Sequence, residues 1–243
     1  MSIVAPYFKI ETFGAVDGPG VRLVIFLQGC PMRCLYCHNP ESWTMNSNKS
    51  ISVDEVIAIY SKNKTFYRNG GITLSGGEPL IHQAFCLGLA EICYKNKISL
   101  ALDTSGVTFT KQNLSFFNKL STFHPLWIVD IKQINPAKHL ILTGIKAQNE
   151  LKLIKFLEEK HEQYWMRQVL LRGYTDDKKD LTKLGLFIRK LKYLSNFEIL
   201  PYHTLGVKKY QTLKIPYKLK GINDTTKIDV HNAKLLITTS RKK

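Results

Sequence analysis

The chain has 243 residues, enough for one large α/β domain, and its 44% hydrophobic and 22% charged residues exclude a disordered or low-complexity protein. Its net charge of +16 invites a nucleic-acid or acidic partner, but half of that excess lies in residues 205–243, which hold 10 basic and 2 acidic side chains. No apolar run reaches the roughly 18 residues of a transmembrane helix, and the N-terminus does not resemble a cleaved leader. We therefore expect a cytoplasmic protein.

Short apolar runs alternate with segments of helical period along the chain. Six runs predict buried strands, at 21–28, 71–74, 98–102, 126–131, 163–169 and 197–201. The first helix should begin near Ser52, which forms a capping-box pattern with Glu55. Apolar residues at helical spacing mark four later helices: Phe85, Leu89, Ile92 and Cys93; Leu114, Phe117 and Leu120; Leu151, Ile154 and Leu157; and Leu181, Leu184, Phe187, Ile188 and Leu191.

This repeated β/α order predicts an α/β fold. Strands that are apolar throughout, rather than alternating, suit a parallel sheet covered by helices. With six strands instead of eight, we expect a partial (β/α)6 barrel of the TIM type, formed by one domain. Its core should span about 8–206, followed by a basic extension at 207–243.

Polar residues follow or end each predicted strand, where a barrel of this kind carries its active site. In strand order they are a three-cysteine loop, Gly76-Gly77-Glu78, Asp103-Thr104, Asp130 with Lys132, Arg167, and Tyr202-His203. Each has a structural explanation when taken alone, such as a helix cap, a surface ion pair or a hydrogen-bonded loop histidine. Six sets at six strand ends favour a shared functional rim.

The cysteine loop has the spacing Cys-x3-Cys-x2-Cys, at Cys30, Cys34 and Cys37. Thiolates are soft ligands that select iron–sulfur clusters, zinc or copper(I). Five cysteines with three in one loop argue against a secreted disulfide framework. Three thiolates would leave one iron of a four-iron cluster open, whereas His38 would complete a Cys3His zinc site. The remaining two, Cys86 and Cys93, are expected to be buried small hydrophobes.

The Gly76-Gly77 pair after the second strand is the other signal. Glycines let the backbone approach a small ligand closely and expose peptide groups for hydrogen bonding. At the same rim as an open iron, the pair predicts the pocket for the ligand of that iron.

On these residues the chain resembles the radical S-adenosylmethionine (radical SAM) enzymes and, within them, the activases of glycyl radical enzymes. The shared motifs are Asp17-Gly18-Pro19-Gly20, Gln28-Gly29-Cys30, Arg33-Cys34-Leu35-Tyr36-Cys37-His38-Asn39, Gly76-Gly77-Glu78-Pro79, Leu102-Asp103-Thr104, Asp130-Ile131-Lys132-Gln133, Arg167, and Leu200-Pro201-Tyr202-His203 with Leu205-Gly206. The resemblance covers about 8–206. Residues 41–70 contain no cysteine, so the chain looks like the type with a single cluster.

The resemblance implies a 4Fe–4S cluster on Cys30, Cys34 and Cys37, with S-adenosylmethionine on the open iron. Reductive cleavage of this cofactor gives a 5′-deoxyadenosyl radical, which abstracts hydrogen from a glycine of the partner enzyme. The implied cofactor contacts are Tyr36, His38, Gly76, Gly77, Glu78, Asp130, Lys132 and His203. A monovalent cation is implied near Asp103 and Thr104, and contact with the partner's peptide at Asp17 and Arg167. For those last two residues, a plain turn and a surface salt bridge are equally good explanations.

The implied partner is the glycine-bearing loop of pyruvate formate-lyase, with flavodoxin or ferredoxin as the electron donor and the activase acting as a monomer. One alternative keeps the chemistry and changes the target to another glycyl radical enzyme or a small molecule. A second alternative, a basic nucleic-acid-binding zinc protein, would explain the charge together with a Cys3His site. No helix concentrates Lys and Arg with interleaved aromatics beside the cysteine loop, so nucleic acid is not the expected partner.

Overall fold

The computed structural model describes residues 2–239 and divides into two compact units. The first unit comprises residues 1–31 and 41–129, and the second comprises 32–40 and 130–243. The last four residues of the basic extension lie outside the described part of the chain. Within residues 2–239, no helix is both long and apolar enough to cross a membrane.

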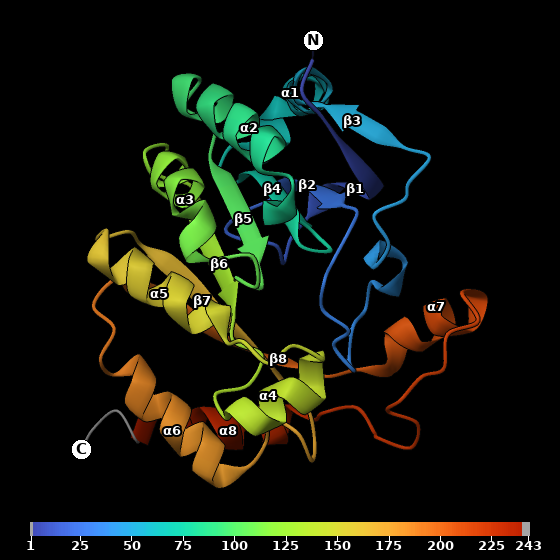
Figure 1. Ribbon diagram of the computed structural model, residues 1–243, viewed down its shortest axis with the longest axis vertical. Helices are drawn as coiled ribbons and strands as arrows, with labels where there is room; N and C mark the ends of the chain where they lie inside the picture. Colours follow the sequence, from blue (N-terminus) through green and yellow to red (C-terminus); the bar gives the residue numbers. More distant parts are fainter. Residues whose placement is uncertain (1, 240–243) are drawn as a thin grey trace. The chain divides into compact units, whose positions relative to one another are not determined.

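The first unit is built on strands in the order β3-β1-β2-β4-β5-β6 (Figure 1). Their bounds are β1 Val4–Gly14, β2 Arg22–Leu27, β3 Ser50–Ser52, β4 Gly71–Gly76, β5 Leu100–Thr104 and β6 Leu126–Asp130. From β2 to β6 the pairing is parallel, whereas β1 pairs antiparallel with both β2 and β3. The predicted parallel strands are confirmed, and β1 and β3 are two antiparallel strands that the sequence analysis missed.

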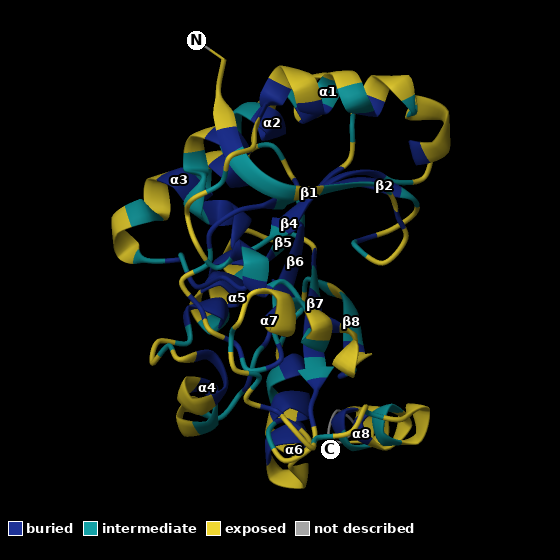
Figure 2. Cartoon of the chain, turned by 90° about the vertical axis from the view of Figure 1, so that its right-hand side faces the viewer, coloured by how far each residue is buried: buried dark blue, intermediate teal, exposed yellow. Residues whose placement is uncertain are grey.

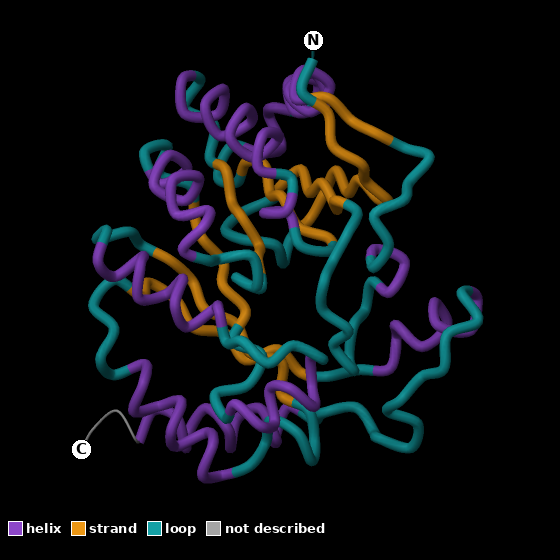
Figure 3. The backbone as a smooth tube through the Cα atoms, viewed as in Figure 1, coloured by secondary structure: helices purple, strands orange, loops and turns teal. Residues whose placement is uncertain are grey.

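Helices α1 Val53–Lys62, α2 Gln83–Lys95 and α3 Leu114–Ser121 lie side by side along this sheet (Figure 3). The predicted capping box opens α1, since the Ser52 side chain accepts from the Glu55 amide and the Glu55 carboxylate accepts from the Ser52 amide. Both Cys86 and Cys93 lie on the buried face of α2, as expected. Strand β4 is buried along nearly its whole length (Figure 2), which matches its uninterrupted apolar run.

The second unit contains the parallel pair β7 Tyr164–Leu170 and β8 Leu194–Pro201. Its helices are α4 Pro136–Thr143, α5 Asn149–Glu159, α6 Lys178–Ile188, α7 Val207–Thr212 and α8 Lys227–Thr239. Helix α8 packs on α6 and β8, so part of the basic extension belongs to the fold. Helix α4 was not predicted, although Asn135 caps its start, Pro136 occupies its first turn and Gly144 ends it at φ 74°.

The strand at one end of the order, β3, does not pair with the strand at the other end, β8, so the sheet is open and not a closed barrel. The predicted α/β class with parallel strands is confirmed, and the two antiparallel strands extend the edge at β2. One domain spanning residues 1–243 stays a prediction.

Candidate functional site

In the first unit, three predicted site segments meet at one edge of the sheet. The register pairs Leu27 with Gly76 and Leu74 with Leu102, so the carboxyl ends of β2, β4 and β5 lie next to one another. The chain leaves these ends through Gly29-Cys30, Gly77-Glu78 and Thr104-Ser105. The predicted convergence of strand-end residues is therefore present within this unit.

The glycine pair is required by the protein's own backbone. A Cβ on Gly77 would lie 2.1 Å from the carbonyl oxygen of Gly29, and one on Gly76 would lie 2.4 Å from the amide nitrogen of Leu27. The Glu78 amide donates to the Gly29 carbonyl at 2.8 Å, which holds the two loops together. The sequence analysis explained the glycines by approach to a ligand, whereas here they allow the loop that carries Cys30 to lie against the loop after β4.

Glu78 is fully buried and receives hydrogen bonds only from neighbouring protein groups. Its Oε1 accepts from the Thr104 hydroxyl at 2.7 Å and the Leu80 amide at 3.2 Å. Its Oε2 accepts from the Ser105 amide at 2.9 Å and from the Ser105 hydroxyl. Burial raises the pKa of Glu78, and the hydrogen bonds oppose that rise. This carboxylate ties the ends of β4 and β5 together, and its contact with a cofactor stays a prediction.

Two further predicted residues lie in the first unit. Asp103 is half-buried, and its Oδ2 accepts from the Ser75 hydroxyl at 2.7 Å. The carbonyl of Asp17 accepts from the Thr73 hydroxyl at 2.8 Å, which fixes the turn between β1 and β2. A buried arginine that the sequence analysis missed, Arg22, also holds this turn, because its guanidinium donates to the Pro19 carbonyl at 3.2 Å and the Thr73 hydroxyl at 2.6 Å. A lone arginine at the start of an apolar strand was the available signal.

In the second unit, Cys34 and Cys37 form one turn, with the Cys37 amide donating to the Cys34 carbonyl at 3.1 Å. Cys34 is buried and Cys37 half-buried, and neither is in a disulfide. The turn is hydrogen-bonded to the end of α4. The Thr143 and Leu142 carbonyls accept from the Arg33 and Leu35 amides at 2.9 Å each. The phenol of Tyr210 in α7 donates to the Cys37 carbonyl at 2.9 Å. The sequence analysis did not identify Tyr210.

Tyr36, which is buried, and the partly buried Lys132 and Asp130 form a group beside this turn. The ammonium of Lys132 lies 2.6 Å from Asp130 Oδ2 and 5.9 Å from the centre of the Tyr36 ring. Burial would lower the pKa of Lys132, but Asp130 and Tyr36 together raise it well above its ordinary value. Burial also raises the pKa of Tyr36, whose hydroxyl is buried with no hydrogen-bond partner among the described residues. Such a hydroxyl needs a partner from outside the protein.

His38 and His203 lie against each other, with ring centres 4.1 Å apart. His38 Nε2 lies 3.0 Å from the His203 carbonyl, which can only accept, so Nε2 is the protonated nitrogen. Burial lowers the pKa of His38. Because Nε2 is engaged, a Cys3His zinc site would have to use Nδ1. The Nδ1 atom of His203 is buried and unpartnered among the described residues, as is the Tyr36 hydroxyl.

Arg167 on β7 is buried, and its Nε donates to Glu198 Oε2 on β8 at 2.9 Å. The ion pair that was the alternative explanation for Arg167 is present, with the arginine buried and Glu198 partly exposed. Its contact with a partner peptide stays a prediction.

The cysteines divide between the units, with Cys30 in the first and Cys34 and Cys37 in the second. Among residues 2–239, no group of three or more His, Cys, Asp or Glu side chains is placed so as to hold a metal ion. The donor set nevertheless fits an iron–sulfur cluster chemically, since three thiols outside any disulfide lie within eight residues of sequence.

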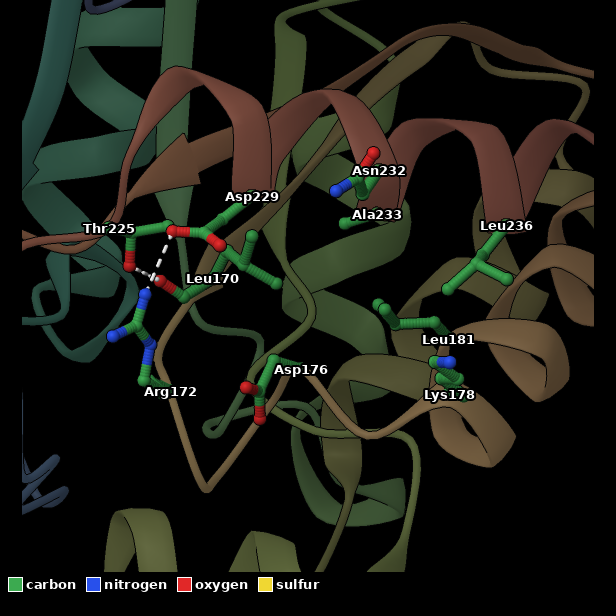
Figure 4. Close-up of a pocket in the computed structure, with 10 residues that line it drawn as sticks. All are labelled: Leu170, Arg172, Asp176, Lys178, Leu181, Thr225, Asp229, Asn232, Ala233 and Leu236. Atoms are coloured by element: carbon green, nitrogen blue, oxygen red, sulfur yellow. Dashed lines mark hydrogen bonds and ion pairs between the residues drawn. The ribbon is translucent and has the colours of Figure 1, made fainter.

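One cavity of about 150 Å³ lies elsewhere in the second unit, between the end of β7, α6 and the start of α8 (Figure 4). Leu170, Leu181 and Leu236 contribute to its lining, and Arg172 pairs with Asp229 at 3.1 Å on its rim. No predicted site residue lines it, so it is separate from the site described above.

Comparison with known proteins agrees with the motifs. A family described as "4Fe-4S single cluster domain" matches residues 16–148. The pyruvate formate-lyase-activating enzyme of Streptococcus mutans is 42% identical over 234 residues, which is 94% of this chain and 89% of that protein.

Solved structures share the fold at low identity. The radical SAM methyltransferase of Sphaerobacter thermophilus matches with a TM-score of 0.66 at 13% identity, over 99% of this chain and 75% of that one. Streptococcus suis SuiB bound to its precursor peptide SuiA matches with a TM-score of 0.68 at 17% identity, over 96% of this chain and 48% of that one. These matches confirm the radical SAM fold. The match to a 4Fe-4S domain argues against the alternative of a nucleic-acid-binding zinc protein. The chain belongs to the pyruvate formate-lyase-activating enzyme family.

Proposed function

We propose that this chain activates pyruvate formate-lyase by generating a glycyl radical on it. The observation that carries the proposal is the 42% identity to the Streptococcus mutans activating enzyme over almost the whole chain. The cysteine loop lies inside the matched single-cluster domain at residues 16–148. When bound, a 4Fe–4S cluster and S-adenosylmethionine supply the electron and the hydrogen-abstracting radical that the reaction needs.

The residues of the chain bind and orient these groups. We assign the cluster to Cys30, Cys34 and Cys37, whose thiolates are the preferred ligands of iron–sulfur centres. The Tyr36 hydroxyl and His203 Nδ1 are buried polar atoms without protein partners in the described chain, which favours hydrogen bonding to a nucleoside cofactor. Lys132 is held by Asp130 as a partly buried cation and is suited to a carboxylate or ribose group.

The other contacts follow from the motif positions. We assign Gly76, Gly77 and His38 to the cofactor as well, and Asp103 and Thr104 to a monovalent cation beside it. Asp17 and Arg167 are assigned to the glycine-bearing loop of the lyase. Burial of the reacting groups would exclude water and competing hydrogen donors from the primary carbon radical.

The same proposal includes flavodoxin or ferredoxin as the electron donor, the cytoplasm as the location and a monomeric activase. These points rest on the family resemblance.

The test uses protein that has been reconstituted with iron and sulfide under anaerobic conditions. It is incubated with S-adenosylmethionine, dithionite and inactive pyruvate formate-lyase. We expect 5′-deoxyadenosine together with the EPR doublet of a glycyl radical. 5′-Deoxyadenosine without the doublet would point to another glycyl radical enzyme or a small-molecule target, and the absence of both would refute the proposal.

A further inference from the structure

A lysine-rich surface surrounds α7 in the second unit. Residues 204–223 contain five lysines and no Asp or Glu. We define the α7 surface by six exposed apolar and basic residues: Leu205, Lys208, Leu213, Lys214, Lys218 and Lys220. Leu205 has 80% of its surface exposed and Leu213 has 41%. An apolar centre surrounded by charges is the usual composition of a protein–protein interface.

The α7 surface is attached directly to the cysteine turn. Tyr210, on the buried face of α7, donates its hydroxyl to the Cys37 carbonyl at 2.9 Å. The Lys209 ammonium donates to Asn39 Oδ1 at 3.0 Å. A Cβ on Gly206 would lie 2.9 Å from the His38 ring, so this end of the segment packs tightly against the same turn. A protein bound to the α7 surface would therefore stand next to a proposed cluster ligand.

The end of α7 fixes the backbone at Lys214. The Ile215 amide donates to the Tyr210 carbonyl at 2.9 Å and the Lys214 amide donates to the Gln211 carbonyl at 3.1 Å. These two hydrogen bonds are those of a Schellman motif, in which Lys214 has φ 55°. The backbone at Lys214 is thus set by the helix end, and its side chain is exposed.

The nearest acidic side chain in sequence, Asp224, accepts from the Thr204 amide at 2.8 Å. Lys208, Lys214, Lys218 and Lys220 make no ion pair with any residue that the structure describes. Neighbouring like charges raise the local positive potential, which a partner rich in carboxylates would neutralise. Charge complementarity therefore favours an acidic protein.

We propose that the α7 surface is the docking site of an acidic protein that carries one electron to the cluster. The inference rests on the proposed function and specifies where its electron enters. The reduced carrier loses one electron, which the oxidised cluster gains, and no proton is transferred. An electron carrier is favoured over the lyase because the surface is fixed to the cysteine turn, where an electron must arrive.

The test compares two variants with the same change in net charge. The first is Lys208→Glu/Lys214→Glu/Lys218→Glu. The control is Lys62→Glu/Lys64→Glu/Lys97→Glu, which alters exposed lysines of the first unit and includes Lys97 at φ 53°, matching the backbone of Lys214. Flavodoxin serves as the acidic carrier. Its affinity is measured by calorimetry without S-adenosylmethionine, and cluster reduction by flavodoxin hydroquinone is followed by stopped-flow absorbance.

For the α7 variant we expect flavodoxin to bind at least about tenfold more weakly and to reduce the cluster correspondingly more slowly at low ionic strength, with a weaker dependence on salt. Reduction by dithionite and the resulting 5′-deoxyadenosine should match the wild type, and the control should retain flavodoxin binding. Unchanged flavodoxin affinity, or an equal loss in the control, would overturn the proposal. So would a variant that still accepts electrons from flavodoxin but fails to activate the lyase, because the surface would then bind the lyase. Failure of the wild type to cleave S-adenosylmethionine with dithionite would instead refute the proposed function.

Discussion

Replacing Glu78 by glutamine should destabilise the first unit although the two side chains have nearly the same shape. Each carboxylate oxygen of Glu78 accepts from one backbone amide, Oε1 from Leu80 and Oε2 from Ser105. A glutamine amide has one oxygen and one NH2 group, which only donates. In either orientation, the NH2 group would face a backbone N–H that cannot reverse its role.

The expected cost follows from that geometry. At least one buried backbone N–H loses its acceptor, which typically costs about 1–3 kcal/mol. The hydroxyls of Thr104 and Ser105 can rotate to accept from the new NH2 group, so they add little to the loss. We therefore expect Glu78→Gln to lower the free energy of unfolding by about 1–3 kcal/mol.

Urea unfolding at neutral pH, followed by circular dichroism, measures this loss as a shift of the midpoint at an unchanged slope. The matched control is Glu91→Gln, because Glu91 is exposed and its ion pair, with the exposed Lys95 at 2.6 Å, lies at the surface. Its expected effect is below about 0.5 kcal/mol. If Glu78→Gln changes stability no more than the control does, the assignment of fixed donors to both oxygens is wrong.

Three further changes test other parts of the structure. Arg22→Met removes the buried hydrogen bonds of the guanidinium to the Ile72 carbonyl and the Thr73 hydroxyl and should cost at least about 3 kcal/mol in urea unfolding, whereas Arg68→Met at an exposed position should cost little. Cys34→Ala should abolish the iron–sulfur absorbance of reconstituted protein, and Cys86→Ala should keep it, because burial raises the pKa of Cys86 and disfavours its thiolate. Iron retained in Cys34→Ala would contradict the ligand assignment. The pKa of Asp177 lies below its ordinary 3.8, because the Asp180 amide donates to its carboxylate. Its stabilisation is therefore present above pH 3.8 and lost as the pH falls through the lower native pKa, so Asp177→Asn should be less stable than wild type at pH 6 and equal to it in strong acid.

Elements with a strong local signal could be predicted from the sequence. The run at 71–74 became β4, and Ser52 with Glu55 opened α1 as a capping box. Strand β1 was missed because its burial is mostly partial and it contains Pro6, which argues against a strand in the sheet interior. It lies between β2 and β3 and is stabilised by pairing that the sequence pattern does not reveal.

The candidate site was predictable as a set of residues but not as a set of contacts. Motif spacing identifies the cysteines, Gly76 and Gly77. It does not show that the Gly29 carbonyl leaves no room for a Cβ at Gly77. Nor does it show that the Glu78 carboxylate accepts hydrogen bonds from Thr104 and Ser105. Those facts depend on which strands become neighbours, and neighbour relations are long-range properties.

The position of the cysteine turn depends on a helix that carries none of the motifs. Helix α4 offers its last carbonyls to the turn, and these are groups that a helix end leaves without intrahelical partners. The helix is itself fixed to α5, because His139 Nε2 lies 3.0 Å from Glu150 Oε1 and both side chains are fully buried. The motif therefore selects which side chains can be ligands, whereas the end of a helix outside the motif holds the backbone that presents them.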